Sequence, residues 1–221
     1  MSDFLLSEFN LDFFRNNLIK YSIKAFKSLP KLDKPRILDV GCGSGVSTIE
    51  LTNLCNGIIV GIDIISLEKL DKKIKEKGLT NQIKLKQCSF FKNGFQDESF
   101  DIVWAEGTFH ILGYEKSFNE SNRLLKRNGY LVIHDETNTL PKKIKLAKKY
   151  DFKLINSFPL PEKAWWSEYY QPLEKKIYEI LPKYEKNNEV LKYLKQQLDE
   201  VNMVKHDPKK FNSIFFIFQK A

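Results

Sequence analysis

Short apolar runs alternate with amphipathic segments through the middle of the chain, and this alternation restricts the fold more than any other feature. Apolar runs of strand length occupy residues 36–40, 58–64, 83–90, 100–105 and 130–134. Segments with helical periodicity separate several of them, at residues 44–55, 66–77 and 117–126. Strands separated by helices predict an α/β fold with a doubly wound, mostly parallel sheet and right-handed crossovers.

The flanking regions extend this pattern at both ends. Near-helical apolar spacing predicts one or two helices within residues 4–29. Two further strands are expected at 153–158 and 213–218, and the region between them favours helices at 172–181 and 188–203. Residues 161–210 are too few for a core of their own. We therefore expect a helical insertion packed on a single domain.

A glycine-rich turn follows the first strand and leads into a helix. Glycine at positions 41, 43 and 45 permits positive φ and close approach of a ligand to the backbone. A turn of this kind in a parallel crossover is the usual place for a nucleotide-like cofactor. Asp39 would repel a pyrophosphate but attract a cation, and the spacing differs from that of dinucleotide binders. Asp63, at the end of the second strand, is placed to accept hydrogen bonds from ribose hydroxyls.

Three segments carry a family resemblance. Residues 37–45, Ile-Leu-Asp-Val-Gly-Cys-Gly-Ser-Gly, resemble the first motif of class I S-adenosylmethionine-dependent methyltransferases. Residues 100–107 and 124–134 are similar to the family's fourth strand and the entry to its fifth. The resemblance covers residues 36–136 and suggests a small-molecule branch similar to quinone methyltransferases. It implies seven strands in the order 3-2-1-4-5-7-6, with an antiparallel last strand.

The same resemblance implies one methyltransferase domain over residues 1–221. Its expected parts are an N-terminal helical cap (1–34), a cofactor-binding core (35–140) and the insertion at 161–210 as a substrate lid. The implied cofactor is S-adenosyl-L-methionine, with S-adenosyl-L-homocysteine as product. The residues expected to hold its methionine half are Asp39, Gly41, Gly43 and Gly45. Those expected around ribose and adenine are Asp63, Ile64, Ser89 and Phe90, and those near the transferring methyl are Ala105 and Glu106.

One of these positions departs from the family pattern. Many relatives have Asp where this chain has Ser89. The usual contact to the adenine amine then depends on a hydroxyl, which still accepts a hydrogen bond.

Two titratable side chains after the fourth strand are catalytic candidates. Glu106 lies where open α/β sheets place ligands, and would steady a cationic cofactor or act as a base. His110 would take a proton from a hydroxyl or an acidic carbon, or else serve a structural role. A metal triad of Glu106, Asp135 and Asn138 is an alternative, but we expect no metal.

Four aromatic residues, Trp165, Trp166, Tyr169 and Tyr170, cluster after the sixth strand. They are interpreted either as core packing of the insertion or as a hydrophobic lid that excludes water from the substrate. The sequence does not separate these two roles.

The net charge of +8 raises the question of a nucleic-acid partner. Only four of the 36 basic residues are Arg, and Arg is the residue best suited to bidentate phosphate recognition. Residues 1–140 sum to +1, while the excess lies at 141–160 (+5) and 201–221 (+3). We interpret these lysines as a solvated face, with the lysines of 142–149 on the outer side of a helix, and expect no nucleic-acid partner.

The expected activity is methyl transfer to a small-molecule acceptor by in-line displacement, with catalysis by alignment and desolvation. The strand-four end reads Ala105-Glu-Gly-Thr instead of the Asn/Asp-Pro-Pro-Tyr run of many enzymes that methylate planar amines. The alternatives are an RNA methyltransferase that uses the lysine patches, a non-catalytic cofactor-binding or scaffold protein and, as a distant third, a nicotinamide-dependent dehydrogenase. Three cysteines and no signal or membrane-spanning segment predict a cytoplasmic protein, monomeric or homodimeric, without a membrane partner.

Overall fold

The computed structural model describes residues 8–138 and 140–221. Contacts between residues divide the chain into two compact units. One comprises residues 21–159 and 213–221 and contains the sheet, and the other comprises residues up to 20 together with 160–212 and is helical. The prediction of a single domain with a cap and an insertion stays a prediction, and the units are described separately.

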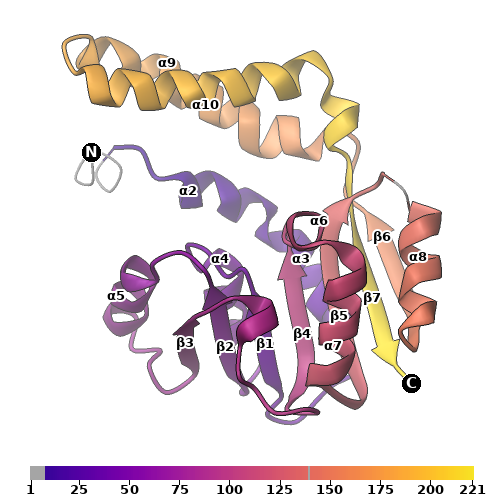
Figure 1. Ribbon diagram of the computed structural model, residues 1–221. Helices are drawn as coiled ribbons and strands as arrows, with labels where there is room; N and C mark the ends of the chain where they lie inside the picture. Colours follow the sequence, from indigo (N-terminus) through magenta and orange to yellow (C-terminus); the bar gives the residue numbers. More distant parts are fainter. Residues whose placement is uncertain (1–7, 139) are drawn as a thin grey trace. The chain divides into compact units, whose positions relative to one another are not determined.

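The first unit is built on a seven-stranded sheet (Figure 1). Its strands are β1 (Arg36–Val40), β2 (Ile58–Asp63), β3 (Ile83–Gln87), β4 (Phe100–Glu106), β5 (Leu125–Glu136), β6 (Phe152–Pro159) and β7 (Ser213–Lys220). Their order is β3-β2-β1-β4-β5-β7-β6. The pairs among β1 to β5 are parallel, and β7 runs antiparallel to both β5 and β6. The predicted fold class and strand order are confirmed.

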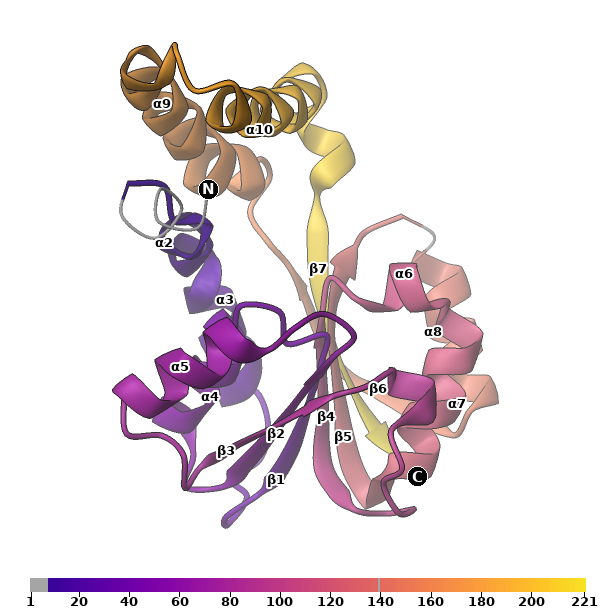
Figure 2. The same ribbon diagram turned by 60° about the vertical axis from the view of Figure 1, so that its left-hand side comes forward.

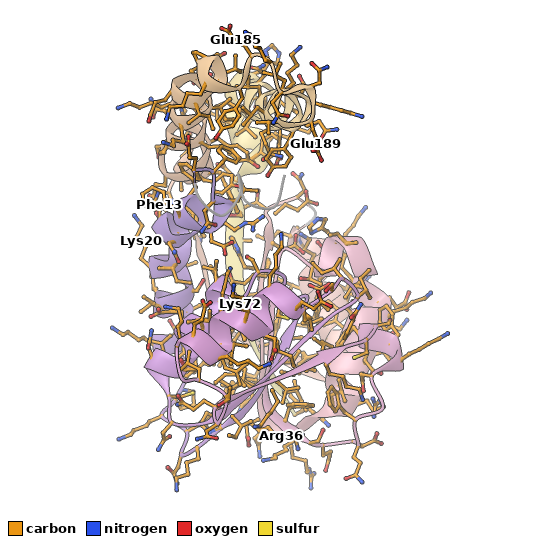
Figure 3. The ribbon with its side chains drawn as sticks, turned by 90° about the vertical axis from the view of Figure 1, so that its left-hand side faces the viewer. Phe13, Lys20, Arg36, Lys72, Glu185 and Glu189 are labelled. Atoms are coloured by element: carbon orange, nitrogen blue, oxygen red, sulfur yellow. The ribbon has the colours of Figure 1, made fainter. Side chains whose placement is uncertain are left out.

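Helices cover both faces of this sheet. They are α3 (Ile19–Lys27), α4 (Val46–Leu54), α5 (Glu68–Glu76), α6 (Phe109–Leu112), α7 (Tyr114–Leu124) and α8 (Leu140–Lys149), with a 3-10 turn η2 (Phe90–Lys92). Helices α4 and α5 lie on one face, and α7 and α8 on the other (Figure 2). Figure 3 shows Lys72 on the surface of α5 and Arg36 at the amino end of β1, the edge of the sheet away from the glycine turn.

The core of this unit is rich in aromatic side chains. Residues 214–218 of β7 are each at most 6% exposed, because β5 and β6 flank the edges of β7 and helices cover both faces of the sheet. Phe118 of α7 packs against Phe109, Phe152 and Phe218, with ring centroids 5.8–5.9 Å apart. This packing holds α6 and α7 on one face of the sheet (Figure 2).

The junction between α7 and β5 differs from the predicted helix at 117–126. The helix begins three residues earlier, at Tyr114, and ends at Leu124, and β5 starts at once. The Asn128-Gly129 pair lies inside β5, where Asn128 has a φ of 60° and the pairing with β4 shifts register between Phe100 and Ile102. The pair therefore forms an irregularity within a strand, which local turn signals do not distinguish from a loop.

The second unit consists of helices. They are α2 (Leu11–Arg15), η1 (Asn16–Leu18), a π-helical segment η3 (Trp165–Tyr170), α9 (Gln171–Ile180), η4 (Leu181–Tyr184), α10 (Asn188–His206) and η5 (Pro208–Phe211). Leu173 and Ile177 of α9 and Leu194 and Val201 of α10 are fully buried. Asn187 caps α10 by accepting from the backbone N–H of Val190 at 3.2 Å. Phe13 on α2 remains 68% exposed (Figure 3).

Candidate active site

The glycine turn joins β1 to α4 at the carboxyl ends of the parallel strands. The backbone N–H groups of Gly41 and Cys42 donate to the Ile62 carbonyl oxygen at 2.8 and 3.0 Å. The N–H of Gly43 donates to Oδ2 of Asp63 at 2.8 Å. The turn is therefore fixed to the end of β2, and Asp63 helps to set the conformation of the glycine backbone.

The three glycines of the turn have different roles. All three have positive φ, 71° at Gly41, 51° at Gly43 and 83° at Gly45. A Cβ at Gly41 would lie 2.7 Å from Oγ1 of Thr108, and one at Gly45 would clash with a methyl group of Leu70. A Cβ at Gly43 would meet no atom nearer than 3.9 Å. Gly41 and Gly45 thus allow the protein to pack against the turn, whereas Gly43 faces open space.

Three carboxylates, Asp39, Asp63 and Glu106, lie at or near the carboxyl ends of the neighbouring strands β1, β2 and β4. Asp39 is 3% exposed and accepts from the hydroxyl of Thr48 at 2.6 Å. Glu106 Oε1 accepts from the Ser47 hydroxyl at 2.9 Å and from Trp104 Nε1 at 2.7 Å. In the described part of the chain, none of Asp39, Asp63 and Glu106 forms a salt bridge with a lysine or an arginine.

The uncompensated charge affects how these groups bind protons. Burial raises the pKa of Asp39 to about 7, repulsion from Glu106 and Asp63 adds to the rise, and the hydrogen bond from Thr48 opposes it. Burial also raises the pKa of Glu106, against hydrogen bonds from Trp104, Ser22 and Ser47. A ligand with positive charge would relieve this repulsion, so the site suits a cation.

Asp39 should make the ligand-free protein less stable as the pH rises. Its folded-state pKa of about 7 lies above the ordinary aspartate pKa of 3.8, so the folded state holds the proton more tightly and loses stability between about pH 4 and 7. The full loss corresponds to roughly 4 kcal/mol above pH 7. Urea unfolding of the wild type and Asp39→Asn over this range should give curves that diverge as the pH rises. Parallel curves would contradict the assigned environment of Asp39.

The other residues expected around the cofactor lie near the same strand ends. Ile64 follows Asp63 and is 71% exposed, as a side chain that covers a ligand would be. The Ser89 hydroxyl accepts from the Phe91 N–H at 3.2 Å and caps η2. The side chain of Phe90 is 3% exposed and that of Ala105 is fully buried, so both residues have mainly backbone atoms to offer a ligand. Their roles in binding remain predictions.

A second group of polar side chains lies where β5 ends. Nδ1 of His110 is 3.3 Å from Oδ1 of Asp135, and the Tyr114 hydroxyl donates to Oδ2 at 2.6 Å. Lys143 Nζ lies 3.9 Å from the same carboxylate and donates to the Glu136 carbonyl oxygen at 2.7 Å. The side chains of Asp135 and Lys143 are 1% and 3% exposed. The expectation that the lysines of 142–149 form a solvated face is therefore wrong for Lys143.

His134 belongs to the core, as its position within a strand predicts. Its ring stacks on Phe215 with centroids 4.3 Å apart, and Nε2 lies 2.9 Å from the Ser213 hydroxyl. Burial lowers its pKa to about 4, so the ring is neutral at physiological pH. Its Nδ1 lies 3.8 Å from Glu106 Oε2, so the buried ring is next to that carboxylate.

The four aromatic residues proposed as a lid belong to the helical unit. Tyr169 and Tyr170 are buried there, and the Tyr170 hydroxyl donates to Glu200 at 2.7 Å. Trp165 and Trp166 are half-buried, and Nζ of Lys205 lies 5.5 Å from the Trp166 ring centroid. These contacts are packing within the unit, and the lid role stays a prediction.

Several contributing residues have no individual signal in the sequence. Ser47 and Thr48 lie in the first turn of α4. The only clue to them in the sequence is that they follow the glycine turn, which itself follows Asp39 near the end of the first strand. The sequence indicates for Trp104 only an apolar residue of a strand, yet its Nε1–H donates a hydrogen bond to the Glu106 carboxylate. Among the described residues no cluster of His, Cys, Asp and Glu has the arrangement of a metal site. None of the described helices is long and apolar enough to span a membrane.

Curated proteins with similar sequences include several methyltransferases. The chain is 32% identical to a demethylmenaquinone methyltransferase of Lactobacillus johnsonii, over 65% of this chain and 63% of that enzyme. It is 35% identical to an uncharacterized methyltransferase, YodH, of Bacillus subtilis, over 48% of this chain and 45% of that protein. An uncharacterized protein of Haemophilus influenzae is also 35% identical, with 45% of this chain and 42% of that protein aligned. The chain therefore matches less than two thirds of the length of each.

Solved structures with the same fold include a putative sarcosine dimethylglycine methyltransferase from Galdieria sulphuraria. It has a TM-score of 0.75 at 18% identity and covers 94% of this chain and 85% of its own. A family model described as a methyltransferase domain matches residues 31–206. The chain belongs to this methyltransferase domain family, which confirms the family predicted from the glycine turn and its flanking strands.

Proposed function

We propose that the protein transfers a methyl group from S-adenosyl-L-methionine to a small-molecule acceptor. The observation that carries this proposal is the glycine turn with its open middle glycine, next to three carboxylates that form no salt bridge with a lysine or an arginine among the described residues. S-adenosylmethionine carries an ammonium and a sulfonium, so it matches the charge that the site leaves uncompensated. When bound, it supplies a methyl group activated by the sulfonium.

The residues of the chain divide the binding task by position. Asp63 accepts hydrogen bonds from ribose hydroxyls while keeping its bond to the Gly43 N–H. Ile64 covers the adenine, and Ser89 and the backbone of Phe90 line its edge. Asp39 and Glu106 counter the positive charges of the methionine half, with Thr48, Ser47 and Trp104 orienting them.

The neighbouring proteins favour a small acceptor. The similar enzyme of Lactobacillus johnsonii is named for demethylmenaquinone, and the structure from Galdieria sulphuraria for sarcosine and dimethylglycine. Neither substrate is assigned to this chain. Absence of a nucleic-acid partner, a monomeric or homodimeric state and a cytoplasmic location remain part of the proposal.

A second function on the same fold is use of the site without methyl transfer. The [4+2]-cyclase SpnF has a TM-score of 0.76 to this chain at 14% identity and covers 91% of it. A fold of this kind therefore also occurs in a protein named for a cyclisation, and function follows from the site. The three carboxylates, which form no salt bridge with a described lysine or arginine, favour a cationic cofactor under either function, so turnover decides between the two.

Calorimetric titration tests the cofactor assignment. The wild-type protein should bind one molecule of either S-adenosylmethionine or S-adenosylhomocysteine per chain, because the two ligands compete for one site. NAD should not bind to the protein. RNA oligonucleotides at low salt should not bind to the protein. An RNA affinity that falls steeply as the salt concentration rises would favour the RNA methyltransferase alternative. Binding of NAD without binding of S-adenosylmethionine would overturn the proposal.

A further inference from the structure

A histidine and a buried carboxylate face one another beside the glycine turn. His110 lies on α6, and its side chain is 45% exposed, whereas the side chain of Asp135 at the end of β5 is 1% exposed. Nδ1 and Oδ1 are 3.3 Å apart. The ring is thus anchored on one side by a carboxylate removed from water and open to solvent on the other.

Asp135 is itself held from two directions. The Tyr114 hydroxyl of α7 donates to its Oδ2 at 2.6 Å, and Lys143 of α8 lies 3.9 Å from the same atom. The Nζ of Lys143 also lies 4.8 Å from the Tyr114 ring centroid. When Nδ1 carries the ring proton, that proton faces this carboxylate 3.3 Å away and Nε2 is left without one, which is the tautomer that a general base requires.

Helix α6 starts against the glycine turn. Thr108, two residues before His110, places its Oγ1 3.1 Å from the Val40 carbonyl oxygen and against Gly41. The N–H of Gly107 donates to the carbonyl oxygen of His134 at 2.9 Å, which ties the same loop to β5. His110 is therefore carried by an element that is fixed to both β1 and β5 at the edge where the cofactor is proposed to bind.

We propose that His110 removes a hydroxyl proton from the methyl acceptor and that Asp135 is the positioning residue for its ring. The acceptor is then a small molecule with an acidic hydroxyl, of the phenol or enol class. This inference rests on the proposed function and narrows its acceptor. A neutral hydroxyl is a weak nucleophile, so this class gains most from a base in contact with the attacking atom.

The step balances with the groups present. The acceptor O–H bond breaks and its proton moves to Nε2 of His110, while the oxygen forms a bond to the methyl carbon. The bond from that carbon to sulfur breaks, and its electron pair stays on sulfur as a neutral thioether. The proton on His110 then passes to water through the exposed side of the ring.

The tautomer of His110 tests the dyad without any acceptor. Protein labelled with ¹⁵N-histidine and saturated with S-adenosylhomocysteine should show His110 with a protonated Nδ1 and an unprotonated Nε2, assigned by loss of the signals in His110→Gln. Asp135→Asn should lose this single tautomer. Glu115→Gln, an exposed acid on α7 beside Tyr114, should keep it. An Nε2–H tautomer in the wild type would overturn the dyad.

Turnover with chosen acceptors tests the base and the acceptor class. Small phenols (catechol, 4-hydroxybenzoate and 1,4-naphthohydroquinone) serve as hydroxyl probes, and N,N-dimethylaniline serves as a nucleophile with no proton to lose. S-adenosylhomocysteine release should occur with phenols, with kcat about 10²- to 10⁴-fold lower in His110→Gln and little change in KM. Asp135→Asn should lower kcat less than His110→Gln, and Glu115→Gln should not.

The outcomes separate this inference from the proposed function. Turnover of dimethylaniline but of no phenol, or full kcat in His110→Gln, would overturn the inference while leaving methyl transfer in place. No turnover with any acceptor and no binding of S-adenosylmethionine would overturn the proposed function, and the tautomer of His110 would still decide whether the dyad exists.

Discussion

Replacement of Gly43 by alanine should weaken binding of S-adenosylmethionine by on the order of 100-fold while leaving the protein folded. The added Cβ meets no protein atom nearer than 3.9 Å, so the fold has room for it. It projects into the open space that the cofactor is proposed to fill. The φ of 51° costs an alanine roughly 1 kcal/mol of stability. Calorimetric titration and urea unfolding measure the two effects separately.

The chain contains a matched control for this substitution. Gly78, just after α5, has a φ of 68°, and a Cβ there would have no neighbour within 4 Å. Gly78→Ala should therefore show the same loss of stability and unchanged cofactor affinity. Equal affinities of the Gly43→Ala and Gly78→Ala proteins would contradict the placement of the cofactor on the glycine turn.

Replacement of Asp63 by alanine should weaken cofactor binding by about 1–3 kcal/mol, roughly 5- to 150-fold. Two losses combine, because the carboxylate would accept from ribose hydroxyls and also accepts from the backbone N–H groups of Gly43 and Ile65 at 2.8 and 3.2 Å. Competitive titration with S-adenosylhomocysteine measures the effect, since both ligands share the ribose.

Two further variants identify which of these losses dominates. Asp63→Asn retains an acceptor oxygen and should lose less affinity than Asp63→Ala. Asp71→Ala removes an acid of α5 whose partner is Lys75 on the same helix, and it should leave binding unchanged. An affinity in Asp63→Ala equal to that of the wild type would contradict the assignment of Asp63 to the ribose.

The elements nearest the glycine turn were predictable because their signals are local. The bounds of β1 agree with the sequence, and β2 and β4 differ from it by one residue, since buried parallel strands appear as short apolar runs that end at glycine or a polar residue. Asp39, Asp63 and the three glycines follow from those strand ends. The prediction that these five residues lie close together thus required only the order of the strands in the sheet.

The pairing of His110 with Asp135 was not predictable in the same way. It depends on how α6 and α7 pack on β5, and Tyr114 and Asp135 are separated by 21 positions in the chain. Lys143 was expected in solvent because lysine is rarely buried. Its burial requires the carbonyl of Glu136 and the carboxylate of Asp135 at one place, which is a property of the packed structure.

Transfer of a labelled methyl group tests the account most directly. Wild-type protein is incubated with S-adenosylmethionine carrying a ¹³C-methyl group and a pool of small metabolites, and the label is followed by NMR. The account predicts that the ¹³C signal moves to a small acceptor with one equivalent of S-adenosylhomocysteine formed, and that Gly43→Ala slows the transfer at limiting cofactor. A cofactor that binds to the wild type but keeps its labelled methyl with every acceptor would contradict methyl transfer.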